Sequence, residues 1–528
     1  MSLTGESIIA GWDGAGSGES VRAVDPASSA ELDPEFEFVT EAAVDAAATG
    51  AGAAFDVFRE TSPAERAAFL ERIAAELDDR REAIVDRACA ESGLPRARIE
   101  GEHGRTTGQI RLFAREVRLG SHQGVRIDEA QPDRAPLPAP DVRQRHIGVG
   151  PVAVFGPSNF PLAFSVTGGD TASALAAGCP VIVKAHNAHP GTAELAGSAV
   201  AAAVEACGLP GGVFSLLFGA GRVVGQALAA HPAIKAIAFT GSQAGGTALM
   251  TTSAARPEPI PVYAEMSSIN PQVVLAGAAA GDLEAFAAAY VGSLTLGAGQ
   301  FCTNPGLLFV PAPAEPLVEA IAGAVATQTG QVMLTAGIRE AYHEGLARLS
   351  AAGAARVCSG RAGESANAPA PVLFTATAAQ VLESPDLQEE VFGSAGLVAA
   401  YESMDELRAV LETLPGQLTA SIHMTGSDHA AAAELVPTLE RKAGRLIANG
   451  WPTGVEVNHA MVHGGPFPAT SDPRATSVGT LAIQRFQRPV CYQNFPPELL
   501  PDAVRDDNPH SVARRLNGEP HHPILSPT

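Results

Sequence analysis

The sequence predicts an α/β protein whose two main domains are each built on a parallel sheet. Short apolar runs alternate with alanine-rich segments of helical length, first over residues 152–239 and again over 272–423. This alternation is typical of β-α-β units, in which helices connect parallel strands. A length of 528 residues, 46% of them hydrophobic, is enough for more than one core.

Before the first alternation, the chain predicts helices and then an irregular segment. Residues 39–87 carry apolar side chains at helical spacing, as in Arg66–Ile73, and indicate successive amphipathic helices. Residues 121–149 differ, because four prolines interrupt any helix before the polar run at 143–148.

The two alternations give specific expected elements. In the first we expect strands at 152–156, 181–184, 213–217 and 234–239, and helices at 171–177 and 192–206. This part is typical of a nucleotide-binding domain. In the second we expect strands at 272–275, 307–310 and 418–423, with a further strand near the end, at 485–494.

Composition excludes several classes of partner. With 35 Lys and Arg against 57 Asp and Glu, the formal charge is −22, which disfavours nucleic acid and anionic membranes. Six scattered cysteines indicate neither disulfides nor a metal site, and a reducing cytoplasm is expected. We find no secretory signal pattern and no uninterrupted apolar run of about 18 residues.

The strongest functional signal is Cys302, in the run Gly299–Gly306. Glycines and a proline around it indicate a turn that presents the sulfur to a substrate. Three more segments, Pro157–Pro161, Phe239–Gly246 and Glu389–Gly393, occur in the order used by one large family, with Glu265 between the second and Cys302. The chain therefore resembles an aldehyde dehydrogenase over nearly its whole length.

Within that family, the chain resembles the α-ketoglutaric semialdehyde dehydrogenase branch. The stretches that carry this resemblance are 159–169, 265–271 and 449–457. The resemblance implies two Rossmann-type parallel-sheet domains and a small β oligomerisation arm, and hence a homodimer or homotetramer. It assigns 1–125 and 151–264 to a cofactor-binding domain, 265–480 to a catalytic domain, 126–150 and 483–500 to the arm, and 501–528 to a C-terminal tail.

The resemblance also implies a nicotinamide cofactor, although no G-x-G-x-x-G fingerprint follows the first strand. Gly241 and Ser242 stand where a strand leads into a helix, and backbone N–H groups there suit a pyrophosphate. Glu390 would hold the nicotinamide ribose and Phe392 would pack against the nicotinamide ring.

Three residues predict NADP as the preferred cofactor, with NAD as the alternative. The family places Lys184 beside the adenosine ribose, and NAD-preferring members commonly carry a glutamate three residues later. Here that position is Asn187, and Arg222 adds a second cation. Two cations without the acid suit a 2′-phosphate.

For the chemistry, the resemblance makes Cys302 the nucleophile, Asn159 an oxyanion-hole amide, and Glu265 the general base that hydrolyses a thioester. The apolar neighbours of Glu265 predict a raised pKa. Ser267 departs from the family, since glycine is usual there, and it puts the local geometry in question.

The branch implies oxidation of 2,5-dioxopentanoate to 2-oxoglutarate. A 2-oxo acid requires a cationic anchor, and four residues are candidates: Arg105, Arg111, His463 and Arg474. Four aromatic residues could line an apolar funnel: Phe160, Phe164, Trp451 and Phe467. The alternatives are another semialdehyde or a fatty aldehyde as substrate and, from a different class, a non-catalytic binding protein that retains the fold.

Overall fold

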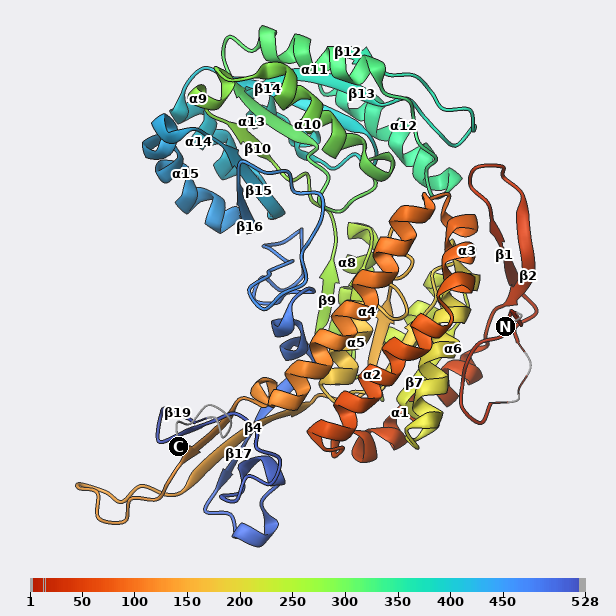
Figure 1. Ribbon diagram of the computed structural model, residues 1–528, viewed down its shortest axis with the longest axis vertical. Coiled ribbons are helices and arrows are strands. Elements are labelled where there is room, and N and C mark those ends of the chain that lie inside the picture. Colours follow the sequence, from red (N-terminus) through yellow and green to blue (C-terminus); the bar gives the residue numbers. More distant parts are fainter. Residues whose placement is uncertain (1–2, 13, 15, 522–528) are drawn as a thin grey trace.

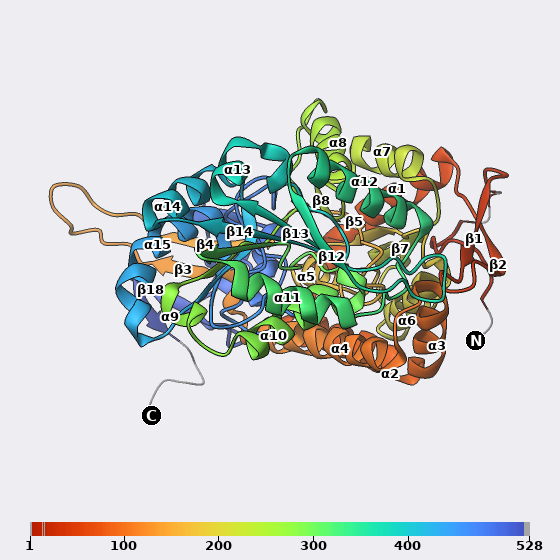
Figure 2. The same cartoon turned by 90° about the horizontal axis from the view of Figure 1, so that it is seen from above.

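Two α/β lobes and a projecting β-arm make up the protein, as the computed structural model shows (Figure 1). The structure describes residues 3–12, 14 and 16–521. The predicted α/β class is confirmed, and both alternations form largely parallel sheets. Figure 2 shows the two lobes from above, with the arm's long loop extending away from them.

The first lobe contains a five-stranded, entirely parallel sheet in the order β7-β6-β5-β8-β9. Its strands lie within two residues of the four expected, and the short β9 is added. They are β5 (Val152–Phe155), β6 (Val181–Lys184), β7 (Phe214–Leu217), β8 (Ala236–Thr240) and β9 (Val262–Glu265). All residues of β5, β6 and β7 are buried, which explains their continuous apolar sequences.

Helices cover this sheet. The connecting helices are α5 (Gly169–Ala176), α6 (Pro190–Ala206), α7 (Gln226–Ala230) and α8 (Gln243–Ala254). The N-terminal helices are α1 (Glu41–Arg59), α2 (Pro63–Asp79), α3 (Arg81–Ser92) and α4 (Arg96–Leu119). A capping box between Ser62 and Glu65 fixes the start of α2. The lobe also carries a hairpin that the sequence did not predict, β1 (Ser20–Val24) with β2 (Glu31–Glu37).

The second lobe contains a seven-stranded sheet in the order β12-β13-β14-β11-β10-β15-β16. It is parallel except for β12, which pairs antiparallel with β13 at one edge. The strands are β10 (Gln272–Val274), β11 (Leu307–Pro311), β12 (Ala355–Ser359), β13 (Val372–Thr377), β14 (Ala395–Tyr401), β15 (Gln417–His423) and β16 (Ala443–Ala448). The helices are α9 (Ala276–Ala279), α10 (Leu283–Thr295), α11 (Glu315–Thr327), α12 (Ala336–Ala351), α13 (Ala378–Glu383), α14 (Met404–Thr413) and α15 (His429–Lys442).

The arm is a third sheet, in the order β17-β4-β3-β18-β19. Its strands are β3 (Val125–Asp128), β4 (Val142–Gly148), β17 (Gln487–Gln493), β18 (Arg514–Leu516) and β19 (Glu519–His521). Residues 501–521, expected as a surface tail, thus supply two strands to this sheet; 522–528 lie outside the described residues. Within the described chain no helix is both long and apolar enough to cross a membrane.

Candidate active site

The first sheet creates a crevice where its strand order reverses. Chain connections run from β5 towards β7 on one side and from β8 to β9 on the other, so the loops after β5 and β8 diverge. Ligands bind outside the carboxyl ends of parallel strands at such a switch point. Asn159 lies on the first of these loops and Gly241 on the second. The crevice is therefore the expected dinucleotide site.

Cys302 lies in a tight loop before β11. The loop requires glycine at 299, where φ is +71° and a Cβ would lie 2.3 Å from the carbonyl carbon of Gly393. The Asn304 amide donates to the carbonyls of Gly299 (2.6 Å) and Gly393 (3.0 Å). The Asn270 amide donates to the Cys302 carbonyl at 2.9 Å. Three backbone contacts thus fix the position of the thiol.

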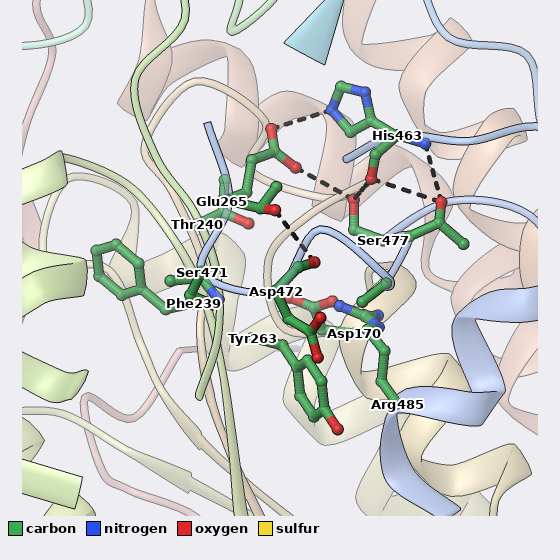
Figure 3. A pocket seen from close by; sticks show the side chains of 14 residues that line it. Asp170, Phe239, Thr240, Tyr263, Glu265, His463, Ser471, Asp472, Ser477 and Arg485 are labelled. Carbon is green, nitrogen blue, oxygen red and sulfur yellow. Dashed lines mark hydrogen bonds and ion pairs between the residues drawn. The ribbon is translucent and has the colours of Figure 1, made fainter. Parts of the chain in front are cut away.

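A histidine joins the thiol to the buried carboxylate. His463 Nε2 lies 3.6 Å from Cys302 Sγ and 3.0 Å from Glu265 Oε1. Ser477 Oγ donates to the other carboxylate oxygen at 3.1 Å. Figure 3 shows Glu265 between His463 and Ser477, with the Asp170–Arg485 ion pair of 2.7 Å below it. Sequence analysis gave His463 as one of four candidate anchors for the substrate carboxylate; the structure places its Nε2 within 3.6 Å of the thiol and 3.0 Å of the Glu265 carboxylate.

The electrostatics around Cys302, His463 and Glu265 contradict the raised pKa that the sequence predicts for Glu265. Burial raises the pKa of the Glu265 carboxyl, but the charge of His463 and hydrogen bonds from His463, Cys302 and Ser477 outweigh burial and leave it below its usual value. The predicted raised pKa is therefore wrong, and Glu265 is ionised at neutral pH. Burial, reinforced by the Glu265 carboxylate, raises the pKa of the Cys302 thiol. Forming the thiolate thus requires a nearby donor that stabilises it, and His463 Nε2, which donates to Glu265 and lies 3.6 Å from the sulfur, is in position.

Asn159 is buried beside the Cys302 loop. Its side-chain amide donates one hydrogen bond, to the Gln300 carbonyl at 2.9 Å, which leaves its second N–H free to donate. Within the described residues, the Cys302 backbone N–H has no hydrogen-bond partner. An amide N–H and a backbone N–H near the nucleophile are the donors that an oxyanion requires.

The cofactor candidates include one buried cation. Lys184 ends β6, and burial lowers its pKa to about 8, so it is largely charged at neutral pH. Its Nζ donates to Asn187 Oδ1 at 3.0 Å, which confirms that these two side chains adjoin. Arg222 is exposed on the turn after β7 and has no ion-pair partner among the described residues. An amino group, an amide and a free guanidinium suit a phosphorylated ribose.

The helix start after β8 has the expected shape, with one difference. Ser242 caps α8 by accepting from the Gly245 N–H. Gly241 donates its own N–H to the Glu265 carbonyl at 3.1 Å, so phosphate donors would come from the first turn of α8 instead. A Cβ at Gly241 would lie 2.7 Å from the Phe239 ring, which explains glycine there.

Glu390 has a partner that the sequence did not reveal. The Ser267 hydroxyl donates to its carboxylate at 2.8 Å, so the serine that departs from the family pattern contacts a predicted cofactor residue. Burial raises the pKa of Glu390 to about 7. Phe392, two residues on, is partly exposed. A partly buried carboxyl group and an accessible ring suit ribose hydroxyls and a nicotinamide face, so the residues present fit the dinucleotide.

A separate cavity of about 650 Å³ opens in front of Cys302. Of the predicted substrate residues, Arg105, Phe160 and Phe164 line it. The others lie elsewhere in the described chain. Arg111 pairs with Asp78 at 2.6 Å on the outer face of α4, and the Arg474 side chain is 88% exposed.

The remaining two aromatic candidates also lie away from the cavity. Trp451 packs against Tyr290 and His423, and Phe467 is 53% exposed. Sequence reasoning missed three residues that contact the site: Arg98, Arg445 and Ser477. No local pattern marks them, because they reach the site only through folding of distant segments.

Comparisons with known proteins agree on one family. The profile described as "Aldehyde dehydrogenase family" matches residues 12–466. The chain is 53% identical over 523 residues to α-ketoglutaric semialdehyde dehydrogenase 2 of Azospirillum brasilense, covering 98% of this chain and 100% of that protein. It is 48% identical over 504 residues to the α-ketoglutaric semialdehyde dehydrogenase of Acinetobacter baylyi, covering 95% of each. The solved aldehyde dehydrogenase KauB of Pseudomonas aeruginosa superimposes with a TM-score of 0.79 at 22% identity, covering 93% of this chain and 97% of KauB.

Proposed function

Because this chain belongs to the aldehyde dehydrogenase family, and is thereby an oxidoreductase using NAD or NADP, we propose that its reaction is the NADP-dependent oxidation of α-ketoglutaric semialdehyde (2,5-dioxopentanoate) to 2-oxoglutarate. The observation that carries the reaction is the contact of His463 with both Cys302 and Glu265. The substrate rests on the two relatives of that name, at 53% and 48% identity.

The first step forms a bond between sulfur and the aldehyde carbon. The thiol releases its proton to solvent, and the N–H of His463 Nε2, which also donates to the ionised Glu265 carboxylate at 3.0 Å, stabilises the thiolate 3.6 Å away. The thiolate attacks the carbonyl carbon, and the oxyanion of the thiohemiacetal accepts hydrogen bonds from the Asn159 amide and the Cys302 N–H. Each such donor contributes on the order of 3 kcal/mol to transition-state stability.

The second and third steps oxidise and release the acyl group. NADP, held by residues such as Lys184 and Glu390, would supply the hydride acceptor. When the hydride leaves the thiohemiacetal carbon, Cys302 carries a thioester. Glu265 then removes a proton from water as the water attacks the thioester, which releases the carboxylic acid and restores the thiol.

The preference for NADP is tested at Asn187. Replacing it with glutamate should lower kcat/KM for NADP by about 10- to 100-fold relative to NAD. The reason is that the new carboxylate would pair with Lys184, which now contacts Asn187 at 3.0 Å, and would repel a 2′-phosphate. Initial rates with both cofactors measure the ratio of kcat/KM for NADP to that for NAD. The control is Asn187→Gln, because glutamine is uncharged but has the same length as glutamate. An unchanged ratio in Asn187→Glu would refute this explanation of cofactor choice.

The role of His463 is tested by the reactivity of the thiol. His463→Asn should lower kcat/KM about 100-fold and slow alkylation of Cys302 by iodoacetamide at pH 7, because the donor that stabilises the thiolate is lost. Ser477→Ala is a matched control, since Ser477 contacts Glu265 but not the sulfur. Equal alkylation rates in His463→Asn and the unmodified protein would remove His463 from thiol activation.

The substrate itself is tested with a panel of aldehydes. We expect kcat/KM to be highest for 2,5-dioxopentanoate, followed by succinic semialdehyde and glutaric semialdehyde, and lowest for hexanal. A preference for hexanal would favour a fatty aldehyde as the substrate.

The assembly is proposed to be a homodimer or homotetramer formed through the arm. Support comes from its edge strands and from exposed apolar side chains: Leu137, Phe495 and Leu499. A cytoplasmic location is proposed because all six cysteines are free thiols. Light scattering in solution measures the oligomeric state.

A further inference from the structure

The cavity in front of Cys302 contains more positive than negative charge. Three guanidinium groups line it, those of Arg98, Arg105 and Arg445, against the carboxyl groups of Glu102 and Glu456. Buried charges require partners, so the hydrogen-bond partners of each guanidinium group show whether it is available to a ligand.

Two of the three arginines are committed to the protein. Arg98 donates to the Asn159 carbonyl at 3.0 Å, lies 3.8 Å from Glu102, and stacks over Phe160 with 4.8 Å from its Cζ to the ring centroid. Arg445 donates to the carbonyls of Gly454 (3.0 Å) and Pro452 (2.7 Å), and its Nε has no partner among the described residues. Both side chains hold loops in place around the cavity.

Arg105 makes longer hydrogen bonds than the other two arginines. Its Nε and Nη2 reach only the Val455 carbonyl, each at 3.5 Å, the upper limit for a hydrogen bond. Its Nη1 is buried and has no hydrogen-bond partner within the described residues. A buried donor without a partner costs free energy that a ligand acceptor would recover.

The residues around Arg105 determine which ligands can reach its guanidinium group. The guanidinium lies over the Phe164 ring at 5.0 Å, and the centroid of the same ring lies 5.9 Å from that of His463. Arg105 and Cys302 line the same cavity, and Phe164 is part of its wall. A five-carbon chain spans about 5 Å when extended, given carbon–carbon bonds of about 1.5 Å. A short semialdehyde can therefore place its aldehyde at Cys302 and its other end towards Arg105.

We propose that Arg105 binds the carboxylate of the aldehyde substrate, and that this contact selects short aldehydes with a carboxylate at the far end. The planar guanidinium can donate to a carboxylate oxygen and to the adjacent 2-oxo oxygen together. Phe160 and Phe164 provide the apolar wall along the intervening methylene groups. The inference rests on the proposed function and adds the residue that determines its specificity.

The test compares charged and uncharged aldehydes in matched variants of helix α4. Arg105→Met should lower kcat/KM for 2,5-dioxopentanoate and succinic semialdehyde about 100-fold, chiefly through KM, and change that for hexanal less than about threefold. Arg105→Lys keeps the charge without the planar pair of donors and should lose about 10-fold on the charged aldehydes only. Arg111→Met is the control, because Arg111 lies on the same helix and pairs with Asp78 outside the cavity.

Two results would overturn the inference: no loss on the charged aldehydes, or an equal loss on hexanal, which would indicate a structural role. If Arg105→Met fails to fold, Arg105→Lys decides by the same comparison. A preference of the unmodified enzyme for succinic semialdehyde over 2,5-dioxopentanoate would contradict the proposed substrate, while the comparison of Arg105 variants would still test the anchor.

Discussion

Replacing Cys302 with alanine should lower kcat by about 10⁴-fold or more, because no covalent intermediate can then form. The geometry of the loop explains why no neighbouring side chain replaces the Cys302 thiol. The thiol is held by contacts of Asn270 and Asn304 with the loop backbone, and His463 Nε2 lies 3.6 Å from the sulfur. NADPH formation followed at its absorbance maximum measures the loss.

Two controls separate chemistry from folding. Cys491→Ala removes an exposed thiol on β17 of the arm and should leave kcat unchanged. Cys302→Ala should still bind NADP with an affinity close to that of the unmodified protein, measured by quenching of tryptophan fluorescence. Turnover by Cys302→Ala above about 1% of the unmodified rate would contradict a thioester mechanism.

Replacing Glu265 with glutamine should separate the two halves of the reaction. One NADPH per active site should form in a first burst, after which turnover should fall by about 10²- to 10⁴-fold, because water is no longer deprotonated. The side chain keeps its size and can still contact His463 and Ser477. Stopped-flow absorbance resolves the burst from the slow phase.

The pH dependence follows from the sign of the shift at Glu265. Its pKa lies below the ordinary value, so the carboxylate persists through neutral pH and is lost only in acid, as pH falls through the lowered pKa. In the unmodified enzyme, thioester hydrolysis should therefore not decline between pH 8 and 6.

A Glu265→Gln variant that turns over steadily at the parent rate would remove Glu265 from hydrolysis.

The fold could be predicted where burial determines sequence. Strands β5, β6 and β7 are buried throughout and appear as apolar runs, so their positions follow from the sequence. The edge strand β12 is largely exposed, and the three-residue strands β18 and β19 carry charged side chains, so no pattern marks them. Pairing with distant strands determines these elements, and the local sequence does not.

The site could be predicted where motifs carry the chemistry. Glu265 ends β9, Asn159 follows β5 and Cys302 precedes β11, so each lies at one end of a strand in one of the two predicted sheets. His463 was only one of four candidate anchors for the substrate carboxylate, since nothing in the loop after β16 shows that it lies at 3.0 Å from Glu265. The sign of the Glu265 pKa shift was wrong for the same reason: its apolar neighbours in sequence are outweighed by a partner about 200 residues away.

The central claim is that Cys302 becomes acylated by the aldehyde and that Glu265 releases the acyl group. The most direct measurement is mass spectrometry of Glu265→Gln, quenched in acid after mixing with NADP and 2,5-dioxopentanoate and then digested. The account predicts a 2-oxoglutaryl group on the peptide that contains Cys302, in an amount equal to the NADPH burst. A burst without acylation of that peptide would contradict it.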